Sequence, residues 1–115
     1  MWPTKSKYRN IKTTRVLPDG SVAKFDSKRE AARWDELCSW QKLAAISNLQ
    51  RQVPFLLSVN GKKIGKLILD FTYTDNLSGQ EIFEDVKSGP TMTPIFRWKA
   101  RHFEAQYNKK VSVVK

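Results

Sequence analysis

The sequence predicts an α/β domain in which a helix, three strands, a second helix and a closing strand follow one another. Residues 27–47 and the stretch from residue 93 onward have the apolar spacing of amphipathic helices. Between them, apolar and β-branched runs alternate with turn residues, which indicates strands. A chain of 115 residues, 40% of them hydrophobic, suits one domain with its own core. We therefore expect a single α/β domain over residues 25–115 and a basic arm or hairpin over residues 1–24.

The N-terminal segment contains a turn signal. Pro18, Asp19 and Gly20 favour a tight turn, because proline fixes φ and glycine readily adopts a positive φ. Val16 and the stretch Val22 to Phe25 on either side are therefore expected to pair as a short hairpin.

The first helix is predicted to run from Ser27 to about Ser47. Small and apolar residues recur along it at helical spacing, among them Ala31, Trp34, Leu37, Cys38, Ala44 and Ala45. Ser27 and Glu30 have the spacing of a capping box, with serine before the first turn and glutamate as its third residue. The residues alone therefore favour a capping role for Glu30.

Three strands are predicted between the helices. The first runs from Leu49 to Val59, and Pro54 within it indicates an edge strand or a bulge, because proline has no N–H to donate. Asn60-Gly61 then signals a hairpin turn. The other two strands, residues 67–73 and 81–87, are joined by a short polar turn.

The second helix begins with Thr93 as its N-cap and Pro94 in its first position. Two apolar stripes run along it, one made of Phe96, Ala100, Phe103 and Tyr107 and the other of Ile95, Trp98, His102 and Ala105. This pattern predicts a helix that is buried over a wide face. A short closing strand is expected at Val111 to Val114.

Two carboxylates are expected to meet across the central strands. If the turn between these strands is centred between Leu77 and Ser78, Asp70 lies directly across from Asp85, where like charges are destabilising. Asp85 and Lys87 are two residues apart and so point to the same sheet face. Two carboxylates and a lysine at one spot indicate a site for a divalent cation, because Mg²⁺ prefers hard oxygen ligands.

Two alternatives remain for these residues. A slip of one residue in the register would place Glu84, instead of Asp85, across from Asp70. Asp70 could also lie at an exposed strand edge, with Asp85 and Lys87 on a solvated polar face.

An acidic residue on one strand followed by acid-X-Lys on the next resembles the PD-(D/E)XK nuclease superfamily. The chain is most similar to a family of small phage proteins in that superfamily, related to phage endonuclease I-type Holliday-junction resolvases. The matching pieces follow one another along nearly the whole chain, and they are Lys7-Tyr8-Arg9-Asn10, Phe25 to Ala31, Asp70-Phe71, Glu84 to Lys87 and Phe96 to Lys99. Leu69 stands where the superfamily's name has proline, and Asp85 stands where glutamate is commoner.

The resemblance implies a restriction-endonuclease-like fold and DNA hydrolysis that depends on Mg²⁺, with Mn²⁺ as a substitute. It implies that Asp70, Asp85, Glu30 and the backbone carbonyl of Val86 hold the metal. Lys87 would orient the attacking water, and the products would carry a 5′-phosphate and a 3′-hydroxyl. Branched DNA as the substrate and a homodimer that makes paired cuts are also implied by the likeness to resolvases.

The charge distribution favours nucleic acid as the partner. The net charge is +10, with six Lys or Arg against one acid in residues 1–24 and again in residues 95–115, while residues 25–94 hold nine of each. Basic ends around a neutral centre are suited to phosphate contacts. The candidate DNA contacts are Lys7, Tyr8, Arg9, Lys28, Arg29, Thr91, Arg97 and Lys99, to which the lysine-rich stretch Lys62, Lys63 and Lys66 could add.

The composition excludes several other classes. A single cysteine, Cys38, leaves no internal disulfide and no cysteine-rich zinc site. A single histidine, His102, speaks against a histidine-based metal site or a catalytic triad. No apolar run reaches transmembrane length and no leader-like stretch follows the N-terminus. We therefore expect a cytoplasmic protein without a membrane partner, in a bacterial host if a phage encodes it.

Taken together, the residues and the resemblance predict a divalent-metal-dependent DNA endonuclease that acts on branched DNA. One alternative is a non-catalytic, basic nucleic-acid-binding phage protein, and another is a small phage protein that modulates a host partner. The spacing of Asp70, Asp85 and Lys87 favours the enzyme, because a binding protein has no use for carboxylates that face phosphates.

Overall fold

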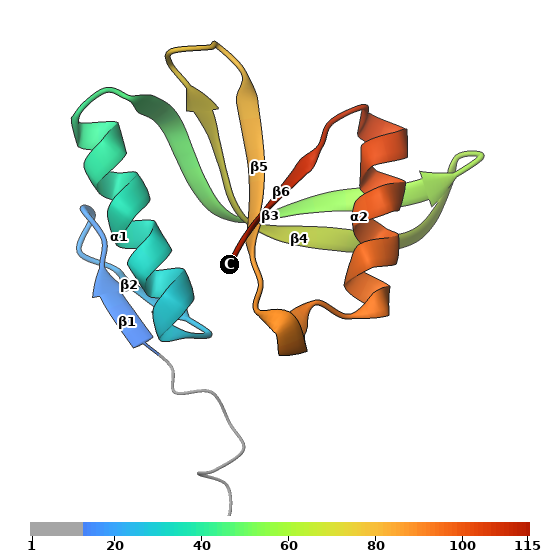
Figure 1. Cartoon of the computed structure of the whole chain (residues 1–115), viewed down its shortest axis with the longest axis horizontal. Coiled ribbons are helices and arrows are strands. Elements are labelled where there is room, and N and C mark those ends of the chain that lie inside the picture. Colours follow the sequence, from blue (N-terminus) through green and yellow to red (C-terminus); the bar gives the residue numbers. More distant parts are fainter. Residues whose placement is uncertain (1–12) are drawn as a thin grey trace, which may run out of the picture. The chain divides into compact units, whose positions relative to one another are not determined.

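The computed structural model describes residues 13–115 and confirms the predicted α/β class and order of elements (Figure 1). Two helices accompany a mixed sheet of four strands and a small antiparallel sheet, an arrangement compatible with a restriction-endonuclease-like fold. The elements are β1 (Thr13–Val16), β2 (Val22–Phe25), α1 (Lys28–Lys42), β3 (Ile46–Val59), β4 (Lys62–Asp75), β5 (Glu81–Val86), a short 3-10 helix (Gly89–Thr91), α2 (Pro94–Tyr107) and β6 (Val111–Val114).

The chain divides into two compact units, one that ends at Glu36 and one from Leu37 to Lys115. The division expected from the sequence, between residues 1–24 and 25–115, stays a prediction. No helix in residues 13–115 combines the length and the apolar character needed to cross a membrane.

The first unit contains the predicted hairpin. β1 and β2 pair antiparallel, with Thr13 opposite Phe25 at one end and Val16 opposite Val22 at the other. In the turn, the Asp19 carboxylate accepts hydrogen bonds from the Ser21 hydroxyl at 2.6 Å and from the Ser21 N–H at 2.9 Å. Both bonds favour the charged carboxylate and lower the pKa of Asp19.

α1 begins as predicted but ends earlier than the predicted Ser47. The Ser27 hydroxyl accepts the Glu30 N–H at 3.1 Å, which is half of the predicted capping box. The helix stops at Lys42 because Ala44 adopts a left-handed conformation with φ 63°. The N–H groups of Ala44 and Ala45 then turn back to the carbonyls of Gln41 and Trp40, a Schellman motif that usually has glycine at the left-handed position.

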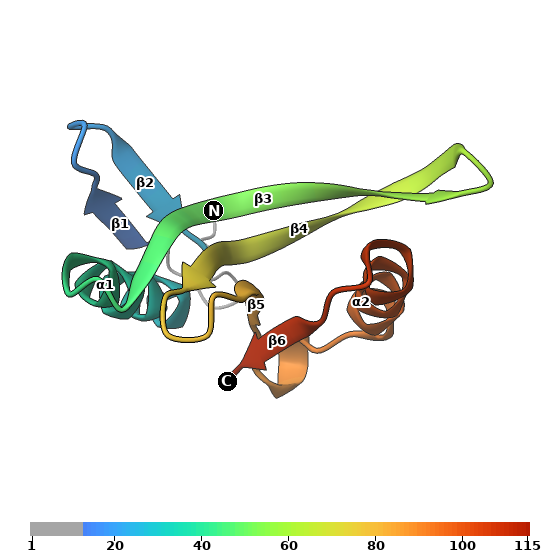
Figure 2. The same ribbon diagram turned by 90° about the horizontal axis from the view of Figure 1, so that it is seen from above.

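The second unit is organised by a four-stranded sheet in the order β3-β4-β5-β6. The first two neighbouring pairs are antiparallel and β5 pairs parallel with β6. Figure 2 shows the long hairpin of β3 and β4. β3 is an edge strand, as Pro54 predicted. Asn60 and Gly61 both have positive φ, 51° and 79°, so they form the two-residue hairpin turn that their sequence predicted.

β3 and β4 are each 14 residues long, longer than the sequence indicated. Their pairing shifts by one residue near the hairpin turn, since Ser58 pairs with Lys63 but Leu57 pairs with Gly65. Ile64 is therefore the extra residue of a β-bulge on β4.

The core of this unit lies between the sheet and α2. It consists of Leu57, Leu67, Leu69, Phe83, Phe96, Ala100 and Phe103. The ring of Phe55 on β3 packs edge-on against Phe103 of α2, with 4.9 Å between ring centroids. A hydrogen bond also joins this helix to β3: the Tyr107 hydroxyl donates to the Leu56 carbonyl at 2.7 Å.

Only one of the two predicted stripes on α2 is buried. The stripe of Phe96, Ala100 and Phe103 faces the core. Two residues of the other stripe, Ile95 and Trp98, have 66% and 75% of their surface exposed. The expectation of a wide buried face was therefore wrong, because α2 contacts the sheet on one side and nothing in the second unit covers its other side.

Candidate active site

The register of β4 and β5 is the one predicted from the turn. Phe71 pairs with Glu84 and Thr74 with Glu81, and the same register sets Asp70 across from Asp85. The alternative register, with Glu84 across from Asp70, is thereby excluded.

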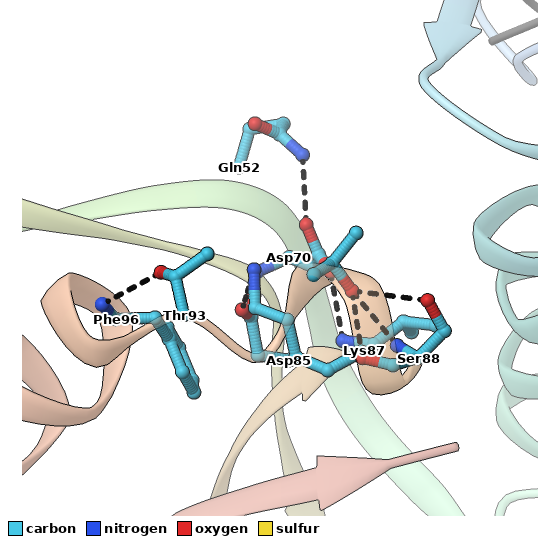
Figure 3. Close-up of polar contacts among 9 residues, drawn as sticks. Gln52, Asp70, Asp85, Lys87, Ser88, Thr93 and Phe96 are labelled. Carbon is cyan, nitrogen blue, oxygen red and sulfur yellow. Dashed lines mark hydrogen bonds and ion pairs between the residues drawn. The ribbon is translucent and has the colours of Figure 1, made fainter.

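Asp70 and Asp85, called the acid pair from here on, hold the two strands together where the ladder of backbone pairing ends. The Asp70 N–H donates to Asp85 Oδ1 at 2.9 Å, and the Val86 N–H donates to Asp70 Oδ2 at 2.8 Å (Figure 3). The two hydrogen bonds are reciprocal, since each strand donates a backbone N–H to the carboxylate of the other strand. A carboxylate offers about four acceptor positions in all, so one such bond leaves positions for a cation.

Lys87 completes the cluster. Its Nζ lies 3.1 Å from Asp85 Oδ2 and 4.5 Å from the centre of the Phe96 ring at the start of α2. The side chain of Asp85 is only 3% exposed, whereas that of Lys87 is 22% exposed. The prediction that Asp85 and Lys87 share a face is confirmed by this contact, and the lysine lies between the acid pair and solvent.

A cavity of about 340 Å³ opens beside Asp85 and Lys87. Its other polar residues are Lys66 from β4, Thr93 from the N-cap of α2 and Lys99 from the next turns of that helix. We call it the site cavity. Three lysines around one buried carboxylate create a surface that attracts anions of phosphate size.

Gln52 joins the acid pair in a row across three strands. The pairs Arg51–Phe71 and Val53–Leu69 place Gln52 opposite Asp70, and Gln52 Nε2 lies 3.4 Å from Asp70 Oδ1 (Figure 3). Sequence reasoning missed this residue. Counting back from the Asn60-Gly61 turn places Arg51 opposite Asp70, and only the bulge at Ile64 brings Gln52 there instead.

A second buried carboxylate was also missed. Glu84 is 1% exposed, and the Tyr73 hydroxyl donates to its Oε1 at 2.7 Å. In the sequence, Glu84 was noted as the alternative partner of Asp70 and as part of the matching stretch Glu84 to Lys87, but not as a buried carboxylate in its own right. The predicted register could have indicated this contact. It places Glu84 opposite Phe71 and diagonal to Tyr73, and so on the other face of the sheet from Asp85.

The other predicted site residues do not contact the acid pair in any hydrogen bond or ion pair described above. Glu30 is buried in α1, within the first unit, and its role as a metal ligand stays a prediction. The Thr91 hydroxyl accepts the Ser88 N–H at 2.8 Å and so closes the turn after β5. Lys28, Arg29 and Arg97 are exposed, and Lys99 is half-buried. Lys7, Tyr8 and Arg9 lie outside the described residues.

The chemistry of the acid pair fits a hard divalent cation only if other oxygen atoms join it. Within residues 13–115, no group of three or more Asp, Glu, His or Cys side chains is arranged to hold a metal ion. The acid pair supplies two carboxylates, and Mg²⁺ commonly takes its remaining ligands from water and backbone carbonyls. Val86, predicted to offer its carbonyl, directly follows Asp85 and donates its N–H to Asp70.

Comparisons with known proteins place the chain in a family but give it no activity. Residues 5–115 match the family model described as "Protein of unknown function (DUF1064)". No curated protein and no solved structure matches the chain. Because the match covers nearly the whole sequence, the chain belongs to the DUF1064 family.

Proposed function

We propose that this protein is a divalent-metal-dependent endonuclease of the PD-(D/E)XK type that hydrolyses phosphodiester bonds in DNA. The observation that carries the proposal is the acid pair, reciprocally bonded across β4 and β5, with Lys87 3.1 Å from Asp85 at the site cavity. Two opposed carboxylates cost stability in a sheet, and the backbone N–H groups offset only part of that cost. A site for a cation explains why both acids stand there.

Asp70, Asp85 and the carbonyl of Val86 would hold Mg²⁺ or Mn²⁺. When bound, the ion lowers the pKa of a coordinated water and offsets the charge that grows on the phosphate. Lys87 orients the attacking water and carries positive charge beside the reacting phosphate. Lys66 and Lys99, across the site cavity, bind the flanking phosphates of the same strand.

The proposed substrate is branched DNA, and the proposed active form is a cytoplasmic homodimer. Both rest on the likeness to phage resolvases, since two paired cuts in a four-way junction need two sites related by symmetry. Arg97, Thr91 and the basic residues of the N-terminal segment are the further DNA contacts in this proposal.

A second candidate is a nucleic-acid-binding protein without catalysis. The net charge of +10 and the three lysines around the site cavity favour it. In that case binding is steeply salt-dependent and indifferent to metal and to the loss of the acid pair.

A cleavage assay separates the two candidates. Labelled four-way junction, Y-fork and linear duplex are incubated with Mg²⁺, Mn²⁺ or EDTA, using wild type, Asp70→Asn, Lys87→Met and the control Glu81→Gln. Glu81 is on the same strand as Asp85, but its side chain is 60% exposed. We expect metal-dependent cleavage that Asp70→Asn and Lys87→Met abolish and Glu81→Gln keeps. Tight binding without cleavage under every metal condition sinks the nuclease proposal and supports the binding protein.

A further inference from the structure

A second cavity lies between α2 and the end of the β3–β4 hairpin, both of which belong to the second unit. It measures about 560 Å³, and its apolar residues are Leu57, Ile64, Ile95 and Trp98. We call it the Trp98 groove. In both views of the fold, α2 runs beside this end of the hairpin (Figures 1 and 2).

The groove is a consequence of the bulge on β4. The register shift makes Ile64 the extra residue, and its side chain is left 59% exposed. Gly65 follows it, and a Cβ added there would meet no atom within 4 Å. Bulges commonly redirect a side chain at a functional edge of a sheet, and here the bulge and the glycine leave open space in front of the indole of Trp98.

Two neighbouring residues of α2 expose apolar surface in this groove. Trp98 is 75% exposed and Ile95 is 66% exposed, one turn of helix apart. Contiguous exposed apolar residues in a concave surface mark a binding site rather than ordinary surface variation. An indole is also a flat ring on which another flat ring can stack.

The charges around the groove indicate what it binds. Lys99 and Arg101 of α2 line it, and among residues 13–115 no Asp or Glu does. A second copy of the chain that packed symmetrically, groove against groove, would bring the same cations together without adding an acid. An occupant that is flat, partly apolar and negatively charged fits the surface, and an unpaired nucleotide is all three.

The groove is continuous with the candidate active site. Ile95 and Lys99 line both the Trp98 groove and the site cavity that contains Asp85 and Lys87. A strand whose phosphate reaches Lys87 therefore passes Lys99 on its way to Trp98.

We infer that the Trp98 groove holds an unpaired base of the DNA strand that is cut, stacked on the indole, while Lys99 and Arg101 bind its phosphates. The preferred substrate is then DNA with a single-stranded segment beside the scissile phosphate, such as a fork or flap, rather than continuous duplex. This inference rests on the proposed nuclease function only where it places the scissile phosphate at the site cavity. The contact between the base and Trp98 needs no catalysis.

Binding in EDTA tests the inference apart from cleavage. Fluorescence anisotropy of a labelled single-stranded oligonucleotide, a Y-fork and a linear duplex is measured for wild type, Trp98→Ala, Trp98→Phe and Gly65→Leu. Leu77→Ala is the control, because Leu77 is 96% exposed in the β4–β5 turn, away from the groove residues. Thermal unfolding of each variant verifies that it folds.

We expect Trp98→Ala to weaken binding of the single strand and the fork about ten-fold or more, the range associated with losing one stacked base. Trp98→Phe should restore most of the affinity, because it keeps an aromatic face. Gly65→Leu should weaken the same two substrates by filling the groove while leaving the indole in place. Duplex binding should change little in all variants, and Leu77→Ala should behave as wild type.

Three results would overturn the inference. One is equal loss of affinity for single strand and duplex, and another is no loss in either Trp98→Ala or Gly65→Leu. The third is a change in sedimentation that shows Trp98→Ala breaking a dimer without an effect on single-strand binding, which would assign the groove to a second copy. A wild-type protein that binds the single strand through Trp98 but never cleaves DNA would keep this inference and reject the proposed nuclease.

Discussion

Glu84 and Asp85 are neighbours on the same strand, and both are almost completely buried, yet their surroundings differ. Glu84 is 1% exposed and accepts a hydrogen bond from the hydroxyl of Tyr73 in the interior of the sheet. Asp85 is 2% exposed, faces another aspartate across the strands and contacts a lysine at the site cavity. The hydroxyl of Tyr73 contacts Glu84, whereas a second aspartate and a lysine contact Asp85 at the site cavity.

Burial of an acid therefore does not by itself distinguish a candidate site from a contact that stabilises the fold. A buried carboxyl group must be hydrogen-bonded or paired wherever it stands, so Glu84 meets the requirement of folding. The acid pair is not needed for folding in the same way, because two opposed carboxylates repel each other and a single acid at this place would cost less stability. The predictions below test whether Glu84 supports stability and Asp85 supports catalysis.

The largest effect is expected from Asp85→Asn. Asparagine keeps an oxygen for the Asp70 N–H but loses the charge that would bind the metal. Cleavage should fall by about three orders of magnitude or more, since a metal-assisted reaction gains several kcal/mol from the ion. The matched change Glu84→Gln should leave cleavage almost unaltered. Initial rates on a Y-fork with Mg²⁺ measure both, and equal rates for the two variants would remove the distinction between these acids.

Tyr73→Phe should affect stability and spare activity. The change removes a hydroxyl that donates to the buried carboxyl group of Glu84 at 2.7 Å. Loss of a hydrogen bond to a buried carboxyl group costs about 1.5–3 kcal/mol of unfolding free energy. Urea unfolding measures the change in unfolding free energy. The cleavage rates of Tyr73→Phe and wild type are compared without urea.

Tyr107→Phe is the control for this change. Its hydroxyl donates to the Leu56 carbonyl, a neutral and more exposed acceptor, so a smaller loss of about 0.5–1.5 kcal/mol is expected. A larger loss for Tyr107→Phe than for Tyr73→Phe would argue against a special role for Glu84 in stability.

Ala44→Gly should stabilise the protein without altering either carboxylate. Ala44 has φ 63° at the end of α1, a conformation that costs an L-residue about 1 kcal/mol and costs glycine almost nothing. Urea unfolding should therefore show a gain of up to about 1 kcal/mol. Ala45→Gly, one residue on and without a positive φ, should give no gain, and unchanged cleavage in both variants would separate stability from catalysis.

The smallest effect on stability is expected from the ionisation of Asp19, an exposed carboxylate that can be compared with the buried Glu84 and Asp85. The Ser21 hydroxyl and N–H lower its pKa below the ordinary aspartate value. The turn therefore gains stability from the ionised carboxylate above that ordinary value and loses it as the pH falls through the lowered pKa. The NMR shift of the Ser21 amide, followed from neutral to acid pH, should titrate below the range of an unperturbed aspartate. Asp19→Asn should abolish this titration, and an ordinary pKa in the wild type would contradict the expectation.

Much of the fold could be predicted because its signals are local. Asn60-Gly61 specified a hairpin turn, Thr93-Pro94 specified the start of α2, and the polar turn before β5 specified the register that opposes Asp70 and Asp85. Each of these depends on a few adjacent residues whose φ, capping or pairing preferences are strong.

The rest depended on tertiary structure. α1 ends at Lys42, and the left-handed residue that follows is Ala44 rather than a glycine, so the helical pattern in the sequence continued past the true end. The row that contains Gln52 exists only because a bulge shifts the pairing by one residue, and no residue pattern marked that bulge. The exposure of Trp98 depends on which side of α2 the sheet covers, which periodicity alone does not decide when both stripes are apolar.

The parallel pairing of β5 with β6 has a consequence for the order of folding. β3, β4 and β5 are joined by short turns and can zip together from neighbouring segments, whereas β6 reaches β5 only after α2 has crossed over the sheet. The Lys87 N–H is bonded to the Val114 carbonyl at 2.8 Å, so the backbone of the lysine at the site is fixed by this last pairing. During synthesis on the ribosome, the strand that carries Asp85 therefore remains an open edge until residues 111–114 have emerged. We therefore expect the sheet of β3, β4 and β5 to form before the backbone of Lys87 reaches its final position.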